Sequence, residues 1–102
     1  MDARKVELKE VGENDAFKYK QVLEVILSRP VNPQAGMQMP EVRRCNKILD
    51  HLETANGFLL LTPDEWQFLK DRIEMFQFGL GGRHVQQFAD DVANAEVVTL
   101  KE

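Results

Sequence analysis

The residues that could do chemistry in this 102-residue chain are few and widely separated. Its two histidines, His51 and His84, have no cysteine or carboxylate at a spacing typical of metal sites, so no zinc site is predicted. Asp90 and Asp91 are adjacent in a predicted helix, where neighbouring side chains point about 100° apart. They are therefore badly placed to share one proton or one metal ion, and we expect both to be solvated.

Nucleophile and phosphate-binding motifs are incomplete. Ser28 is the only serine, and Cys45 lies on the apolar stripe of a predicted helix, where we expect a buried, inert thiol. The run from Gly79 to Gly82 resembles a phosphate cradle in composition alone, because it lacks the Lys-Ser/Thr pair that holds phosphate and metal. We therefore predict no catalytic residue, no metal site and no cofactor, and the sequence indicates a protein that is not an enzyme.

Three predicted helices share one apolar spacing, i, i+3, i+7 and i+10, which gives each helix a single core-facing stripe. These stripes are Val42, Cys45, Leu49 and Leu52; Trp66, Leu69, Ile73 and Phe76; and Val85, Phe88, Val92 and Ala95. The middle helix has the clearest start. Thr62 is its predicted N-cap, Pro63 suits the first helical position, and Glu65 completes a capping box.

A further helix is expected from Asn14 or Asp15 to Leu27, although a strand could instead resume at Phe17 and Tyr19, which alternate with lysines. Residues 4–11 alternate charged and apolar side chains as a half-buried strand does, and residues 58–61 and 96–101 are short apolar or β-branched runs. The predicted fold is one helix-dominated α+β domain spanning residues 1–102. It has three to four helices and a small sheet built from the terminal strands and residues 58–61.

Four apolar residues are candidates for contact with a partner. Phe68 and Met75, seven residues apart, share a second row rotated well away from the main stripe of their helix. They are either covered by their own domain or offered to a partner. Met37 and Met39 lie in a long Pro/Gly/Met loop, residues 29–40, and either form an adaptable contact or fold back onto the edge of the core.

A local cluster of basic residues suggests a second function, but the net charge of the chain does not favour it. Three basic side chains gather on one flank of the helix predicted from Pro40 to Asn56, namely Arg43, Arg44 and Lys47. They either contact phosphate or an acidic partner, or pair within a solvated face with neighbours such as Glu41 and His51. The net charge of −4 weakens any case for nucleic-acid binding, which needs a sustained basic surface. The alternative function is therefore a small DNA-associated transcriptional regulator that uses this flank.

A set of mainly apolar positions between residues 17 and 92 forms a recognisable pattern. It comprises Tyr19, Val22, Leu23, Ile26, Leu27, Gly36, Met37, Glu41, Arg44, Ile48, Leu49, Asp50, Leu52, Glu53, Ala55, Leu61, Leu69, Lys70, Phe88, Asp90, Asp91 and Val92. Together these residues resemble short uncharacterised proteins encoded by tailed phages and prophages of proteobacteria. The resemblance implies a phage-type setting in which small acidic proteins act as adaptors, virion assembly components or inhibitors of host machinery.

The chain is expected to stay in the cytoplasm of the host bacterium, with the virion as a second location. Its first ten residues lack the apolar core of a secretory signal, and no apolar run approaches the roughly 20 residues that cross a bilayer. We therefore expect no contact with membrane, and the acidic net charge makes nucleic acid the less favoured partner. The leading hypothesis is a non-enzymatic interaction protein that self-associates or docks on one protein partner of phage or host origin.

Overall fold

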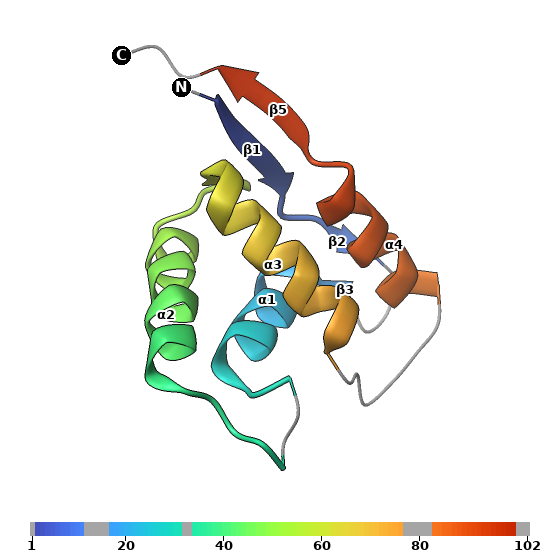
Figure 1. Cartoon of the computed structure of the whole chain (residues 1–102). Helices are drawn as coiled ribbons and strands as arrows, with labels where there is room; N and C mark the ends of the chain where they lie inside the picture. The colour runs from blue at the N-terminus through green and yellow to red at the C-terminus, as the bar shows by residue number, and fades with distance from the viewer. Residues whose placement is uncertain (1, 12–16, 32–33, 77–82, 100–102) are drawn as a thin grey trace.

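A computed structural model describes residues 2–11, 17–31, 34–76 and 83–99 (Figure 1). Its elements are β1 (Asp2–Glu7), β2 (Glu10–Val11), β3 (Phe17–Lys18), α1 (Tyr19–Ser28), α2 (Met39–Glu53), β4 (Phe58–Leu61), α3 (Pro63–Met75), α4 (Arg83–Ala93) and β5 (Glu96–Thr99). The predicted helix-dominated α+β fold is thereby confirmed.

The main sheet has the order β4-β1-β5, with both neighbours antiparallel to β1. Val6 of β1 pairs with Leu59, and Arg4 pairs with Leu61 on one side and Val97 on the other. The predicted sheet of two terminal strands and residues 58–61 is thus correct. Strand β1 lies at the centre of this sheet because it is hydrogen-bonded on both edges.

A second, two-stranded ribbon pairs β2 with β3, with Val11 opposite Phe17. The helix predicted from Asn14 or Asp15 therefore begins later than expected, at Tyr19, because Phe17 and Lys18 are extended. The strand that the sequence left open as the alternative is the one observed. Residues 14 and 15 lie outside the described residues.

The helices cover one face of the main sheet. Figure 1 shows α3 in the middle of the molecule, with α4 on one side and α1 and α2 on the other. Side chains of β4 alternate between the two faces, as strand geometry requires. Leu59 and Leu61 are buried in the core, whereas Phe58 and Leu60 are exposed on the opposite face.

One hydrophobic cluster joins the sheet to all four helices. Its fully buried members include Tyr19, Leu23, Ile48, Leu52, Leu69 and Phe88. Burying a side chain of this size contributes roughly 1.5–3 kcal/mol relative to leaving it in water, so these stripes are the main source of stability. The shared i, i+3, i+7 spacing therefore belongs to the scaffold.

The capping box that starts α3 is formed as predicted. The Thr62 hydroxyl accepts from the Glu65 backbone N–H at 3.2 Å, and a Glu65 carboxylate oxygen accepts from the Thr62 N–H at 2.9 Å. Ahead of β4, Gly57 adopts a φ of +81°, a left-handed conformation that glycine allows without strain. Together these local features fix where α3 begins beside β4.

Candidate functional site

The second row of α3 contains an arginine between the two apolar residues singled out above. Phe68, Arg72 and Met75 follow the spacing i, i+4 and i+7, which places them on one face of the helix. Arg72 is 2% exposed and is the one buried charged side chain among the described residues. A charge buried this deeply needs partners for its donors, because its desolvation is otherwise costly.

The guanidinium of Arg72 finds these partners in three separate segments. Its Nε donates to the backbone oxygen of Ile26 at 2.8 Å, and one Nη donates to the carboxylate of Glu41 at 2.5 Å. The other Nη donates to the backbone oxygen of Arg29. Carbonyls at the end of a helix lack partners within it, so Arg72 satisfies acceptors at the end of α1 while binding the first turn of α2. We call Arg72 and Glu41 the clamp.

The two loop methionines lie in different surroundings, and only Met37 contacts the clamp. The sulfur of Met37 is 3.8 Å from the same Arg72 Nη, and the Met37 side chain packs against the core. Met39 is 57% exposed and is the first residue of α2. Of the two predicted arrangements, Met37 therefore folds back and Met39 is left open to solvent.

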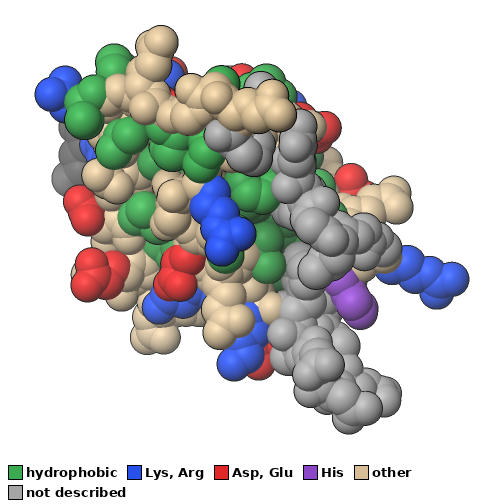
Figure 2. All heavy atoms as spheres, turned by 90° about the horizontal axis from the view of Figure 1, so that it is seen from below, with side chains coloured by type: hydrophobic (Ala, Val, Ile, Leu, Met, Phe, Trp, Pro, Cys, Tyr) green, Lys and Arg blue, Asp and Glu red, His purple; other side chains and the backbone are tan. Residues whose placement is uncertain are grey.

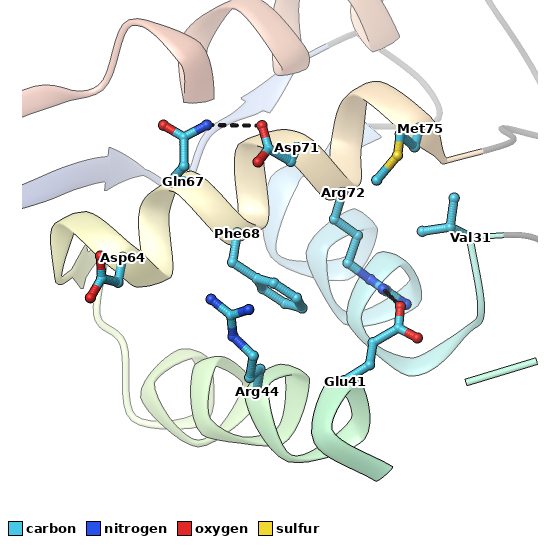
Figure 3. A pocket seen from close by; sticks show the side chains of 9 residues that line it. All are labelled: Val31, Glu41, Arg44, Asp64, Gln67, Phe68, Asp71, Arg72 and Met75. Atoms are coloured by element: carbon cyan, nitrogen blue, oxygen red, sulfur yellow. Dashed lines mark hydrogen bonds and ion pairs between the residues drawn. The ribbon is translucent and has the colours of Figure 1, made fainter. Parts of the chain in front are cut away.

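Phe68 and Met75, paired in the sequence prediction, differ in the structure. Phe68 is half-buried against the core, and the guanidinium of Arg44 lies 4.4 Å from its ring centroid. Met75 is 62% exposed. Figure 3 shows Phe68 pointing from α3 toward Arg44 on α2, with Met75 further along the helix near Val31. Their role as partner-binding residues stays a prediction.

A groove runs between α2 and α3 on either side of Phe68. At the Met75 end it opens into a hollow of about 330 Å³ whose lining includes Glu41, Asp71 and Arg72. At the Thr62 end a second hollow of about 550 Å³ is lined by Lys47, Ile48, Pro63 and others. Arg44, Asp64 and Phe68 line both hollows, so we treat the two as one α2–α3 groove.

The two walls of the groove carry opposite charge. Arg44 and Lys47 are exposed on α2, whereas Asp64 and Asp71 are exposed on α3. Gln67 of α3 donates to Asp71 at 2.8 Å, which orients that carboxylate (Figure 3). The groove thus combines an aromatic floor with a basic wall and an acidic wall.

The basic flank of α2 does not form the pairs with Glu41 and His51 that one of the two sequence interpretations predicted. Glu41 is bound by Arg72, and His51 lies 3.2 Å from Glu65 of α3, so neither pairs with the flank in the described residues. Arg43 and Lys47 are exposed, and Arg44 covers Phe68. Figure 2 shows basic, acidic and hydrophobic side chains interspersed over the described part of one face. A nucleic-acid contact there stays a prediction.

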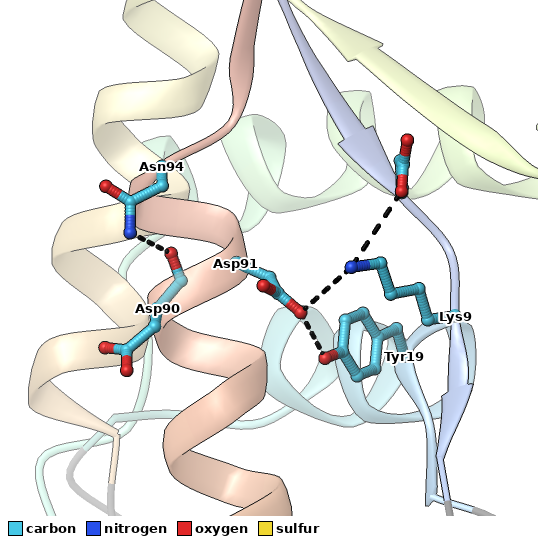
Figure 4. A network of polar contacts seen from close by, with 6 residues as sticks. Lys9, Tyr19, Asp90, Asp91 and Asn94 are labelled. Atoms are coloured by element: carbon cyan, nitrogen blue, oxygen red, sulfur yellow. Dashed lines mark hydrogen bonds and ion pairs between the residues drawn. The ribbon is translucent and has the colours of Figure 1, made fainter.

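A second polar cluster joins α1 to α4. The Tyr19 hydroxyl donates to a carboxylate oxygen of Asp91 at 2.6 Å, and Lys9 lies 3.5 Å from the same oxygen (Figure 4). The expectation that Asp90 and Asp91 are both solvated holds only in part for Asp91, whose side chain is 33% exposed and is bound by Tyr19 from 72 residues away. Asp90 is exposed as expected.

Burial is the main reason why the pKa of Tyr19 is raised above its ordinary value, and the nearby Asp91 carboxylate raises it further. The tyrosine therefore remains protonated and serves as a hydrogen-bond donor. Burial likewise raises the pKa of the Cys45 thiol, which is 1% exposed on the core stripe of α2. The predicted burial of Cys45 is confirmed.

Sequence reasoning missed Arg72 and the partnership of Asp91. For Arg72 a signal was present, since a charged residue stood in the middle of a row that otherwise held Phe68 and Met75. For Asp91 there was none, because its partner lies in another helix.

Among the described residues, no three or more His, Cys, Asp or Glu side chains gather as metal ligands. In the same part of the chain, no helix has the length and apolar character needed to cross a membrane.

Comparison of the chain with protein-family models, with curated proteins and with solved structures finds no match. The function must therefore be inferred from the geometry of the α2–α3 groove and the residues that hold it.

Proposed function

We propose that this chain is a non-enzymatic accessory protein of phage or prophage type that acts by docking a protein on its α2–α3 groove. The observation that carries the proposal is the half-buried Phe68 on the floor of an open groove, with the exposed Met75 at one end. Aromatic and methionine side chains in a concave site are the usual anchors of protein–protein contacts.

The charged walls suit such a contact. Protein interfaces place apolar groups at the centre and charged groups at the rim, where charge adds specificity and association rate. Here Arg44 and Lys47 form one rim and Asp64 and Asp71 form the other, with Phe68 between them. A protein partner can satisfy both rims, whereas the phosphate backbone of a nucleic acid would be repelled by the acidic one.

The clamp makes the groove a prepared surface. Arg72 extends from α3, hydrogen-bonds to α1 and forms an ion pair with the start of α2. The walls are thereby held in place before any partner arrives, which lowers the entropy cost of binding. A virion assembly component, an adaptor and an inhibitor of a host protein would each use such a surface, and the core-pattern resemblance supports the phage setting for all three.

The test compares two exposed apolar positions on different faces. Met75→Glu places a charge at the groove, whereas Leu60→Glu places the same charge on the open face of the sheet, where Leu60 is also exposed. A protein captured by the tagged chain would be purified, and its affinity for each variant measured by calorimetry. We expect Met75→Glu to weaken binding about tenfold or more and Leu60→Glu to leave it unchanged. The reverse pattern would place the docking surface on the sheet.

A separate measurement of DNA binding tests the alternative function. Replacing Arg43, Arg44 and Lys47 together should abolish a steeply salt-dependent binding to duplex DNA if the basic flank reads phosphate. Flat binding curves for the unaltered protein at low salt would end this alternative.

A further inference from the structure

The charged rows on the two walls of the groove lie in a specific order. Lys47 lines the hollow at the Thr62 end, whereas Asp71 lines the hollow at the Met75 end, and Phe68 lines both. Lys47 and Asp71 thus lie on opposite helices and at opposite ends of the groove, with Phe68 between them. A two-fold axis that lies in the plane of the groove near Phe68, perpendicular to the line from Lys47 to Asp71, therefore brings each of these residues over the other residue of a second copy.

The order of charges restricts the kind of partner. A uniformly acidic surface would be repelled by Asp64 and Asp71, and a uniformly basic one by Arg44 and Lys47. A partner surface that carries both basic and acidic side chains avoids both repulsions. A second copy of this chain does so, because identical subunits associate most often about a two-fold axis through a self-complementary patch.

We propose that the α2–α3 groove binds a second copy of this chain in a two-fold symmetric dimer, in which Lys47 of each copy faces Asp71 of the other. This inference rests on the proposed function and names the occupant of the same groove. The axis passes near Phe68, so each ring, together with the Arg44 guanidinium that lies over it, is near the centre of the contact. Each charge pair occurs twice, once on either side of the axis.

The shape of the groove is also compatible with this dimer. The rotation that brings Asp71 over Lys47 also carries Met75 from its own end of the groove to the Thr62 end of the second copy. That end holds the larger hollow, about 550 Å³, whose lining includes Ile48, Pro63 and Phe68. The exposed, flexible Met75 side chain thereby gains an apolar site on the second copy.

Charge reversal tests the arrangement. In Lys47→Glu and in Asp71→Lys, a homodimer would contain two like-charged contacts in place of two attractive ones. We expect each variant to dimerise about tenfold more weakly, or worse, than the unaltered chain in sedimentation equilibrium. A 1:1 mixture of the two variants should restore dimers. In the mixed dimer the two introduced charges, which are opposite in sign, face each other at one contact, and the other contact keeps the native Lys47–Asp71 pair.

The matched control is Glu24→Lys, which reverses an exposed charge on α1 away from the groove lining. It should dimerise as the unaltered chain does, and circular dichroism should show all variants folded. An unaltered chain that is monomeric at all accessible concentrations would overturn the inference. A dimer that both reversals leave intact would do so too, as would a mixture that fails to restore it.

Failure of the dimer and failure of the proposed function give different results. A monomeric chain whose captured protein partner is lost in Met75→Glu overturns the second copy as occupant and leaves the docking groove standing. A dimer that neither Met75→Glu nor the two charge reversals disturb places self-association elsewhere and overturns the second copy as occupant, whereas a captured partner whose affinity Met75→Glu leaves unchanged removes the groove from the proposed function.

Discussion

Two arginines lie at the same face of α3, Arg72 on the helix itself and Arg44 on the neighbouring α2, and their surroundings are opposite. Arg72 is buried and donates to two backbone carbonyls and a carboxylate, whereas Arg44 is exposed and lies over the ring of Phe68. The side chains are chemically identical, so the difference comes from the surroundings. The Arg72 guanidinium is buried where α1, α2 and α3 meet and completes the scaffold, whereas the Arg44 guanidinium lies at the surface of the α2–α3 groove.

Burial decides how much a charged side chain contributes to the stability of the fold. In the interior the free energy of an unpaired charge is high, so a buried arginine stabilises the fold only if its partners remain. At the surface, water competes with every contact, and a cation over an aromatic ring contributes about 0.5–1 kcal/mol. Variants of these two residues and of their partners should therefore fall in a predictable order of stability.

The largest effect is expected from Arg72→Met, which keeps the bulk of the stem but removes every donor. The carbonyls of Ile26 and Arg29 and the carboxylate of Glu41 would lose their partner, and we expect a loss of about 3–5 kcal/mol in the free energy of unfolding. Urea denaturation measures it. A loss below about 1 kcal/mol would show that the clamp is dispensable and that the two arginines are alike.

Glu41→Gln should come next. The amide retains the shape of the side chain but removes the charge from the 2.5 Å contact with Arg72. Because the Glu41 side chain is 31% exposed and water can partly replace it, we expect a smaller loss, about 1–2 kcal/mol. Glu53→Gln, at an exposed position of the same helix, is the control and should leave the denaturation midpoint unchanged.

Tyr19→Phe tests a polar contact of intermediate burial. Losing the hydrogen bond to Asp91 should cost about 1 kcal/mol near neutral pH. The pKa of Tyr19 is raised by burial and by Asp91, so the unfolded chain loses this proton first once the pH exceeds about 10. Stability of the unaltered protein should therefore fall above that pH, and fall less steeply in Tyr19→Phe. Parallel denaturation curves across this range would contradict the raised pKa.

The smallest effect on stability is expected from Arg44→Ala, about 0.5–1 kcal/mol, because the guanidinium is exposed and Phe68 keeps its core contacts. Thermal unfolding monitored by circular dichroism measures this loss. A loss as large as that of Arg72→Met would erase the distinction between the two arginines.

The parts of the fold that could be predicted from the sequence are those governed by local rules. The stripes of α2, α3 and α4 follow from helical periodicity, and the Thr62 capping box follows from residues three apart. The polar contacts that hold the groove instead join residues far apart in the sequence. Arg72 meets Ile26, Glu41 and Arg29 across separations of 46, 31 and 43 residues, which no local pattern specifies.

In the candidate site, too, some features follow from local sequence rules and others depend on long-range packing. The sequence identified Phe68 and Met75 as an unusual row, because helix geometry sets that row apart from the main stripe. It did not predict that one would be half-buried and the other exposed, since that depends on which residues of the other helices pack beside each of them. The acidic wall of Asp64 and Asp71 has no local signature either, because it is defined by the position of Arg44 and Lys47 across the groove.

The topology of the sheet also governs the order in which the protein can fold. Strand β1 is central and precedes every other element, yet its partners β4 and β5 come much later, and Asp2 meets Thr99 across a separation of 97 residues. A growing chain can form the α1–α2 pair while β1 is still unpaired. Closure of the sheet waits for β5, so the final step joins the most distant segments and is expected to limit the folding rate.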